Sequence, residues 1–327
     1  MSVIPHHPLG FVPSLEVLPL IGTTLQPPAS PTPPLRLRAC SSYGSIARGM
    51  LTAELSGGIL PWEVFINEVL ALPGQRAHWM VPLFLHPCPT EILVKDSVFK
   101  YLHPSRSGTR VKPPGRLVFG IESRSSLTRS QVRAWLARWN HKSAIQLEFK
   151  VLPMNLMLEG VKAEILDGII VPTPWGKYAE SAGVGKVDPH FTPGLLSQKL
   201  ALVLRRDVSE NPFPDPSAAA LDLTAARRQL RNPSVLLKAA AEMARHGRPF
   251  LPAAIIGGSA ELHLQQNDPA EFTPSSAQLV HELLILRDLS ALPPQIAPTR
   301  QTALLLAAAS EPTQVPHSLS KTPPRPD

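Results

Sequence analysis

The middle of the chain alternates between short apolar runs and segments with a helical spacing of apolar residues, and this alternation limits the fold more than any other feature. The runs predict strands, and the segments between them predict helices. The predicted elements are RLVFGIES (116–123, strand), LTRSQVRAWLARWNH (127–141, helix), AIQLEFKVLP (144–153, strand), NLMLEGVKAEIL (155–166, helix), DGIIVP (167–172, strand) and PWGKYAESAGVG (174–185, helix). Strict alternation is typical of parallel βαβ units, so we expect an α/β fold with a doubly wound sheet.

The segments on either side of this block predict a second lobe that the block interrupts. Its expected helices and strands are 44–55 and 61–72 (helices), 79–86, 91–98 and 199–207 (strands), and 217–231, 234–247 and 276–289 (helices). We therefore expect residues 1–114 and 199–309 to form one lobe and residues 115–198 to form the other. Residues 310–327 are rich in Ser and Pro and contain few apolar residues, which predicts a disordered tail.

Composition excludes several classes of protein. The net charge is +7, but Lys and Arg are dispersed and aromatic residues make up only 6% of the chain, so direct nucleic-acid binding is disfavoured. No apolar run reaches the length of about 18 residues that a membrane span needs. The N-terminal segment lacks the pattern of a secretory signal, so we expect a cytoplasmic protein. A periplasmic or membrane-associated location is the alternative if an upstream start codon restores an export signal.

Motifs of catalysis and of cofactor or metal binding are missing from the sequence. The two cysteines, Cys40 and Cys88, lack the CxxC spacing of zinc sites. There is no Gly-x-Ser-x-Gly elbow, no His-Glu-x-x-His helix and no Rossmann glycine set. We therefore expect no enzyme, no cofactor and no metal site.

Five segments, taken in order, resemble a known family of binding proteins. They are SYGSIARGMLTAELSGG, WMVPLFLHPCPTEILV, LVFGIESRSSLTRSQVRAWL, VLPMNLMLEGVKAEILDGIIVPTPWGKYAESAG and QKLALVLRRD. Over about residues 10–265 the chain is similar to the nitrate- and bicarbonate-binding branch of the type II periplasmic solute-binding proteins. The resemblance implies a two-lobed type II periplasmic-binding-protein fold that holds an anion in the cleft between the lobes.

The same resemblance implies which residues contact the anion. Tyr43 stands where the family has a Trp, Thr90 is the nearest match to an amide side chain, and Thr128 falls in the register of a His. Trp175 matches the Trp of the family's Pro-Trp pair, and Lys199 matches the lysine that supplies the positive charge. Three hydroxyl donors and one cation suit a small oxyanion, which accepts hydrogen bonds and donates none. The same set suits a different ligand equally well, because hydroxyl groups both donate and accept hydrogen bonds.

Several of these residues also have a purely structural interpretation. Thr128 precedes a predicted helix and can act as its N-cap, while Lys199 can be a solvated charge at a strand edge. Trp175 follows the strand predicted over 167–172, where it either walls a cleft at the carboxyl end of the sheet or fills a core.

We therefore expect a non-catalytic anion-binding protein of the nitrate type, whose lobes close on nitrate, nitrite or bicarbonate. The missing export signal favours a cytosolic nitrate/nitrite sensor, similar to the sensors that sequester an RNA-binding antitermination regulator. The alternative is the substrate-binding component of a nitrate/bicarbonate-type ABC transporter, which works with an ABC permease. An enzyme similar to the pyrimidine-synthesis relatives of thiamine biosynthesis is disfavoured by the missing His and Cys chemistry.

Overall fold

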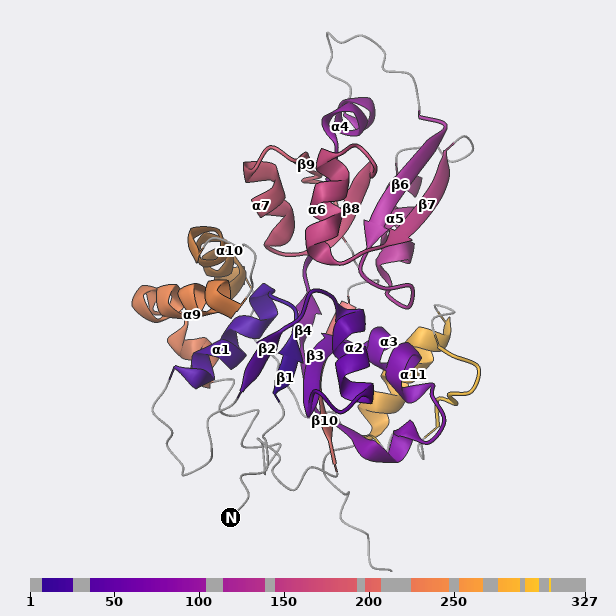
Figure 1. Cartoon of the computed structure of the whole chain (residues 1–327), viewed down its shortest axis with the longest axis vertical. Coiled ribbons are helices and arrows are strands. Elements are labelled where there is room, and N and C mark those ends of the chain that lie inside the picture. The colour runs from indigo at the N-terminus through magenta and orange to yellow at the C-terminus, as the bar shows by residue number, and fades with distance from the viewer. Residues whose placement is uncertain are drawn as a thin grey trace, which may run out of the picture.

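Two lobes, each built around a five-stranded mixed sheet, make up the protein (Figure 1). The computed structural model describes residues 8–25, 36–103, 114–138, 145–192, 198–206, 225–246, 253–266, 276–288, 292–299 and 306. The predicted α/β class with two lobes is confirmed. The predicted tail over 310–327 lies outside the described residues.

The sheet of the first lobe has the strand order β2-β1-β3-β10-β4. Strand β1 runs parallel to β2 and β3, whereas β10 runs antiparallel to both β3 and β4. The strands are β1 Leu9–Phe11, β2 Leu37–Ala39, β3 Gly57–Pro61, β4 Trp79–Cys88 and β10 Gln198–Arg205.

Helices lie on both sides of this sheet (Figure 1). On one side lie α2 (Tyr43–Leu51), α3 (Trp62–Phe65) with its π-helical continuation η2 (Ile66–Leu70), and α11 (Ser276–Asp288); on the other lie α1 (Leu18–Thr24), α9 (Pro233–His246) and α10 (Ala253–Gln266). Short 3-10 turns, η1 (Leu15–Val17) and η3 (Gln75–His78), precede α1 and β4. The sequence analysis did not anticipate β1, β2, β3, α1 or α10. Most of the helix predicted over 217–231 lies outside the described residues.

The second lobe contains the alternating block, and its six predicted elements are all present. Its sheet has the order β7-β6-β8-β5-β9, with β6 parallel to β7 and β8 and β5 antiparallel to β8. The elements are β5 Thr90–Val94, α4 Asp96–Leu102, β6 Arg116–Ile121, α5 Thr128–Ala137, β7 Gln146–Val151, α6 Met154–Lys162, β8 Gly168–Pro172, α7 Trp175–Ser181 and β9 Lys186–Val187.

The first passage of the chain between the lobes lies earlier than the sequence analysis expected. Strand β5 pairs with β8 and β9, so the chain enters the second lobe at Pro89, between β4 and β5, and not after residue 114. The expected strand over 91–98 also ends at Val94, and α4 begins at Asp96. The apolar run shows that a strand is buried, but the sheet in which it is buried depends on a partner far along the chain.

Close packing of backbone against backbone fixes the centre of the first sheet. Gly57 begins β3, next to β10, and a Cβ atom at this position would lie only 2.2 Å from the carbonyl oxygen of Val203. Because that oxygen belongs to the backbone, the clash with a side chain at position 57 cannot be relieved by rotation of a neighbouring side chain.

We expect Gly57→Ala to lower the free energy of unfolding by about 1–3 kcal/mol or more, because β3 and β10 must move apart to admit the methyl group. Urea unfolding monitored by circular dichroism measures the change. Gly115→Ala is the matched control, since a Cβ at that position has no atom within 4 Å. Equal stability of the two variants would contradict this account of the sheet.

Candidate ligand site between the lobes

Hydrogen bonds between the loops at the carboxyl ends of the strands join the two lobes. The indole Nε1 of Trp175 donates to the carbonyl oxygen of Pro13 at 2.8 Å, across the boundary between second and first lobe. The backbone amide of Leu15 donates to the carbonyl oxygen of Thr173 at 3.3 Å, and the backbone amide of Met154 donates to the carbonyl oxygen of Ser41 at 3.2 Å. The structure therefore represents a conformation in which the lobes are in contact.

A cavity of about 470 Å³ lies at this boundary. The first lobe lines it with the loops that follow β1 and β2 and with one side of α2. The second lobe contributes Met154 and Asn155 from the first turn of α6, and Trp175 from the start of α7. Its volume lies within the range of sites that enclose small organic ligands, about 300–1,000 Å³.

Trp175 walls this cavity and is also buried. Its side chain is 5% exposed and meets the ring of Tyr178 edge-on, with 6.2 Å between the ring centroids. Trp175 thus lies at the boundary as a buried ring that also lines the cavity, and its role in ligand binding stays a prediction.

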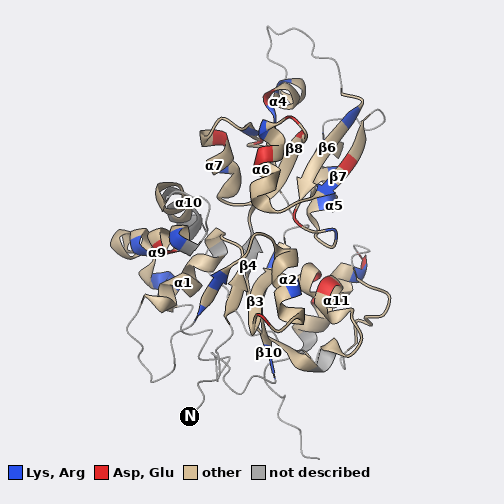
Figure 2. Ribbon diagram, in the orientation of Figure 1, with Lys and Arg blue, Asp and Glu red and all other residues tan. Residues whose placement is uncertain are grey.

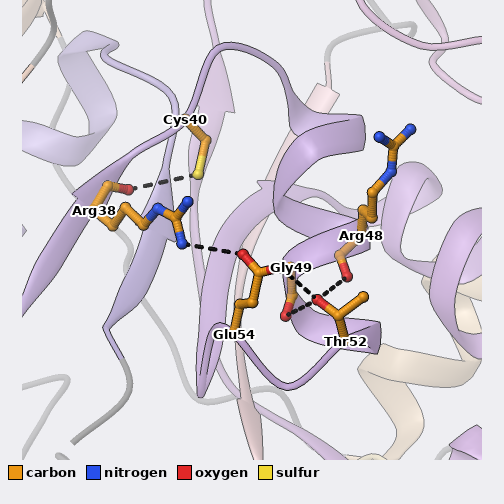
Figure 3. Close-up of polar contacts among 6 residues, drawn as sticks. All are labelled: Arg38, Cys40, Arg48, Gly49, Thr52 and Glu54. Carbon is orange, nitrogen blue, oxygen red and sulfur yellow. Dashed lines mark hydrogen bonds and ion pairs between the residues drawn. The ribbon is translucent and has the colours of Figure 1, made fainter.

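The cavity contains two arginines in different electrostatic situations (Figure 3). The guanidinium of Arg38 on β2 lies 3.3 Å from the carboxylate of Glu54. Arg48 on α2 is exposed, and its guanidinium makes no ion pair within the described part of the chain. Figure 3 shows it pointing away from the pair of Arg38 and Glu54.

Cys40 also faces the cavity, beside Arg38. Its Sγ lies 3.7 Å from the carbonyl oxygen of Arg38 (Figure 3). Burial raises the pKa of the Cys40 thiol, against the opposing effect of the Arg38 charge. The thiol is therefore neutral at pH 7 and adds no negative charge to the cavity.

Buried carboxyl groups form a second contact between the lobes. Glu63 on α3 accepts hydrogen bonds from the backbone amide of Leu127 at 3.2 Å and from Nε2 of Gln198 at 2.9 Å. Glu68 accepts one from the hydroxyl of Ser123, which belongs to the second lobe. Burial raises the pKa of Glu63, an effect that these hydrogen bonds oppose.

Glu122 is a functional candidate that the sequence analysis did not identify. It follows the last residue of β6, is 5% exposed, and its Oε1 has no hydrogen-bond partner among the described residues. Burial raises the pKa of Glu122 to about 8, so the carboxyl is neutral at pH 7. Its place directly after an apolar strand of a parallel pair was the available signal, because such positions face the cleft of an α/β sheet.

The structure places Tyr43, Thr90 and Thr128 in buried surroundings beside the boundary. Tyr43 is the first residue of α2, and the hydroxyl of Thr90 donates to Oε1 of Gln131 at 3.3 Å. Thr128 begins α5, whose N-cap is Leu127, so the interpretation of Thr128 as the cap is wrong. Its hydroxyl has no hydrogen-bond partner among the described residues.

Lys199, the predicted ligand cation, already has a partner. Its Nζ forms an ion pair with Oε1 of Glu282 on α11, within the first lobe. The side chain of Lys199 is 36% exposed and that of Glu282 is 10% exposed. Of the five predicted site residues, Trp175 alone lies among the described residues that line the cavity.

Two further observations concern only the described part of the chain. No group of three or more His, Cys, Asp or Glu side chains there is arranged to hold a metal ion. No helix there combines the length and the apolar character that crossing a membrane requires.

Comparison with known proteins identifies relatives at the level of family and fold. The profile of the NMT1-like family matches residues 6–243. No curated protein matches the sequence.

Three solved structures with a similar fold carry names of binding proteins. The periplasmic nitrate-binding protein NrtA from Synechocystis PCC 6803 is 15% identical, with a TM-score of 0.66 over 92% of this chain and 86% of that chain. The zinc-bound ligand-binding component of an ABC-type import system from Staphylococcus aureus is 14% identical, with a TM-score of 0.63 over 86% and 91%. The periplasmic aliphatic sulphonate binding protein SsuA from Escherichia coli is 15% identical, with a TM-score of 0.60 over 91% and 97%. The predicted periplasmic-binding-protein fold is confirmed.

We expect the stability of the protein to depend on the protonation of Glu122. The folded protein keeps the proton to a higher pH than the unfolded chain, whose glutamate has the ordinary pKa of 4.5. The contribution of the Glu122 carboxyl to the free energy of unfolding is thus complete below pH 4.5 and is lost as the pH rises through about 8. Glu122→Gln does not titrate, so between these limits the free energy of unfolding of the wild type should fall relative to the variant by about 1.4 kcal/mol per pH unit.

Urea unfolding at a series of pH values measures this difference. Glu159→Gln, which changes an exposed carboxyl on α6, serves as the control. A constant difference between wild type and Glu122→Gln across the series would refute the assignment.

Proposed function

The chain belongs to the NMT1-like family, and we propose that it is a non-catalytic solute-binding protein that closes its lobes on a small ligand in the cavity between them. The observation that carries the proposal is that both lobes line this cavity. A ligand that contacts both lobes binds the closed conformation more tightly than the open one, and so shifts the population toward closure. Binding is thereby converted into a change of shape that a partner protein can recognise.

The names of the structural neighbours support this proposal. One is the ligand-binding component of an ABC-type import system, and two others are periplasmic binding proteins for nitrate and for aliphatic sulphonates. By analogy with them, we propose that this protein delivers its ligand to an ABC permease.

The size of the cavity favours a ligand larger than nitrate. A water molecule occupies about 30 Å³ in the liquid, and nitrate is only a few times larger. It would leave most of a cavity of about 470 Å³ to solvent. Nitrate, nitrite or bicarbonate is the second candidate, favoured by the likeness to NrtA. The pairing of Lys199 with Glu282 makes this candidate the weaker one, because an anion at Lys199 has to compete with that carboxylate.

The protein's location and its partner distinguish an import component from a regulator. Figure 2 shows Lys and Arg on both lobes, interspersed with Asp and Glu. The predicted cytosolic sensor, acting on an RNA-binding antitermination regulator, stays a prediction beside the import proposal.

Trp175 provides the test of the proposed function. We expect Trp175→Ala to weaken ligand binding by about 30-fold or more, because it removes the ring that walls the cavity and the hydrogen bond that joins the lobes. Native mass spectrometry of the freshly purified protein identifies the retained ligand, and calorimetry with that ligand measures the affinity. Small-angle scattering measures closure in the same samples.

The control for this variant is Leu156→Ala, which truncates an exposed apolar side chain on α6 outside the cavity. We expect it to bind as the wild type does. If the wild type retains no ligand, and a panel of nitrate, sulfonates, carboxylates and amines changes neither its scattering profile nor its melting temperature, the solute-binding proposal fails.

Fractionation of cells that express the tagged protein at its native level tests the location. An import component should be recovered with the envelope and should co-purify with a permease. Recovery from the cytosol together with an RNA-binding protein would replace the import proposal with the sensor.

A further inference from the structure

Among the described residues that line the cavity, one cation has no ion-pair partner. Arg38 is paired with Glu54, and these two charges cancel. Cys40 is neutral at pH 7 because burial raises its pKa. Arg48 remains, so the described residues that line the cavity carry one net positive charge.

The position of Arg48 suits the head group of an anionic ligand. Arg48 follows Ser45 by three residues on α2, so both side chains lie on the same face of the helix, and both line the cavity. A guanidinium presents a planar fork of donors that matches the oxygens of a carboxylate or a sulfonate. A dianionic phosphate needs a second free cation. Arg38 does not supply it, because it is paired with Glu54.

The rest of the cavity wall suits an apolar body. Besides Arg38, Arg48 and Glu54, the lining includes apolar side chains from both lobes, namely Val12, Leu55, Met154 and Trp175. These four residues are 5% exposed or less, so only small parts of their side chains face the cavity. A hydrocarbon group covers those parts, whereas a purely inorganic ion leaves them in contact with water. Asn155, exposed at the start of α6, adds an amide on the second lobe.

We infer that the ligand is an organic monoanion, whose carboxylate or sulfonate head binds Arg48 of the first lobe while its flat apolar body lies against Trp175 of the second. This inference rests on the proposed function, because it names the chemical class of solute that the same cavity accepts. It differs from a nitrate site in requiring the apolar body, and from a phosphate site in requiring only one free cation.

The test uses Cys40 as a reporter of occupancy, because its thiol lines the cavity. In a Cys88→Ser background Cys40 is the only thiol of the chain, and mass spectrometry follows its alkylation by iodoacetamide. The probes share one ring and differ in charge: benzoate and benzenesulfonate are monoanions, phenyl phosphate is a dianion, benzamide is neutral and benzylamine is a cation. Nitrate is included as an anion without an apolar body.

We expect benzoate or benzenesulfonate at millimolar concentration to slow alkylation more than benzamide, benzylamine or nitrate does. Arg48→Gln should weaken this protection about 10- to 100-fold, as expected for the loss of a charge-assisted hydrogen bond. Arg245→Gln, which removes an exposed arginine on α9, should leave the protection unchanged. Glu54→Gln releases Arg38 and should strengthen binding of phenyl phosphate relative to benzoate.

Three results would overturn the inference: protection by benzamide or benzylamine that equals that of the anions, no protection by either monoanion, or equal protection in wild type and Arg48→Gln. A neutral or cationic solute found in the freshly purified protein would overturn it as well. In that case the solute-binding proposal survives, because it requires only that some ligand closes the lobes.

Discussion

The hydrogen bond from the Trp175 indole to the carbonyl oxygen of Pro13 is the contact on which the arrangement of the two lobes depends. It joins the start of α7 in the second lobe to the loop after β1 in the first, and its donor belongs to the ring that walls the cavity. The same side chain therefore helps to hold the lobes together and also bounds the space for a ligand. The other hydrogen bonds between the lobes act beside it.

The buried carboxyl groups complete this boundary without making it strongly negative. Glu63 and Glu68 accept hydrogen bonds from the second lobe, so separation of the lobes exchanges these bonds for hydrogen bonds to water. Glu122 remains protonated at pH 7 because burial raises its pKa. A cleft that contains several carboxyl groups can thus remain compatible with an anionic ligand, since at least one of them carries no charge.

Local patterns in the sequence predicted the elements of the alternating block, whereas the short strands β1, β2 and β3 of the first lobe were missed. The alternation over residues 116–185 identified every strand and helix of that block, and the position of Trp175 after an apolar strand placed it at the boundary. The partner of Lys199 could not be anticipated, because Glu282 lies on a helix far downstream. The cavity likewise depends on Arg38 and Arg48, which come from separate elements and have no shared motif. The sequence could not predict the lobe to which β5 belongs, because β5 pairs with β8, which lies far along the chain.

The strand order of the first sheet has a consequence for how the chain folds. Strand β10 lies between β3 and β4, yet the whole second lobe separates it from them along the chain. The second lobe is continuous from β5 to β9, so its contacts can form as soon as that segment has been synthesised. The first lobe cannot close its sheet until β10 emerges, and until then β3 and β4 each have an unpaired edge. We therefore expect the inserted lobe to fold first during synthesis and the lobe that contains the amino-terminal strands to be completed last.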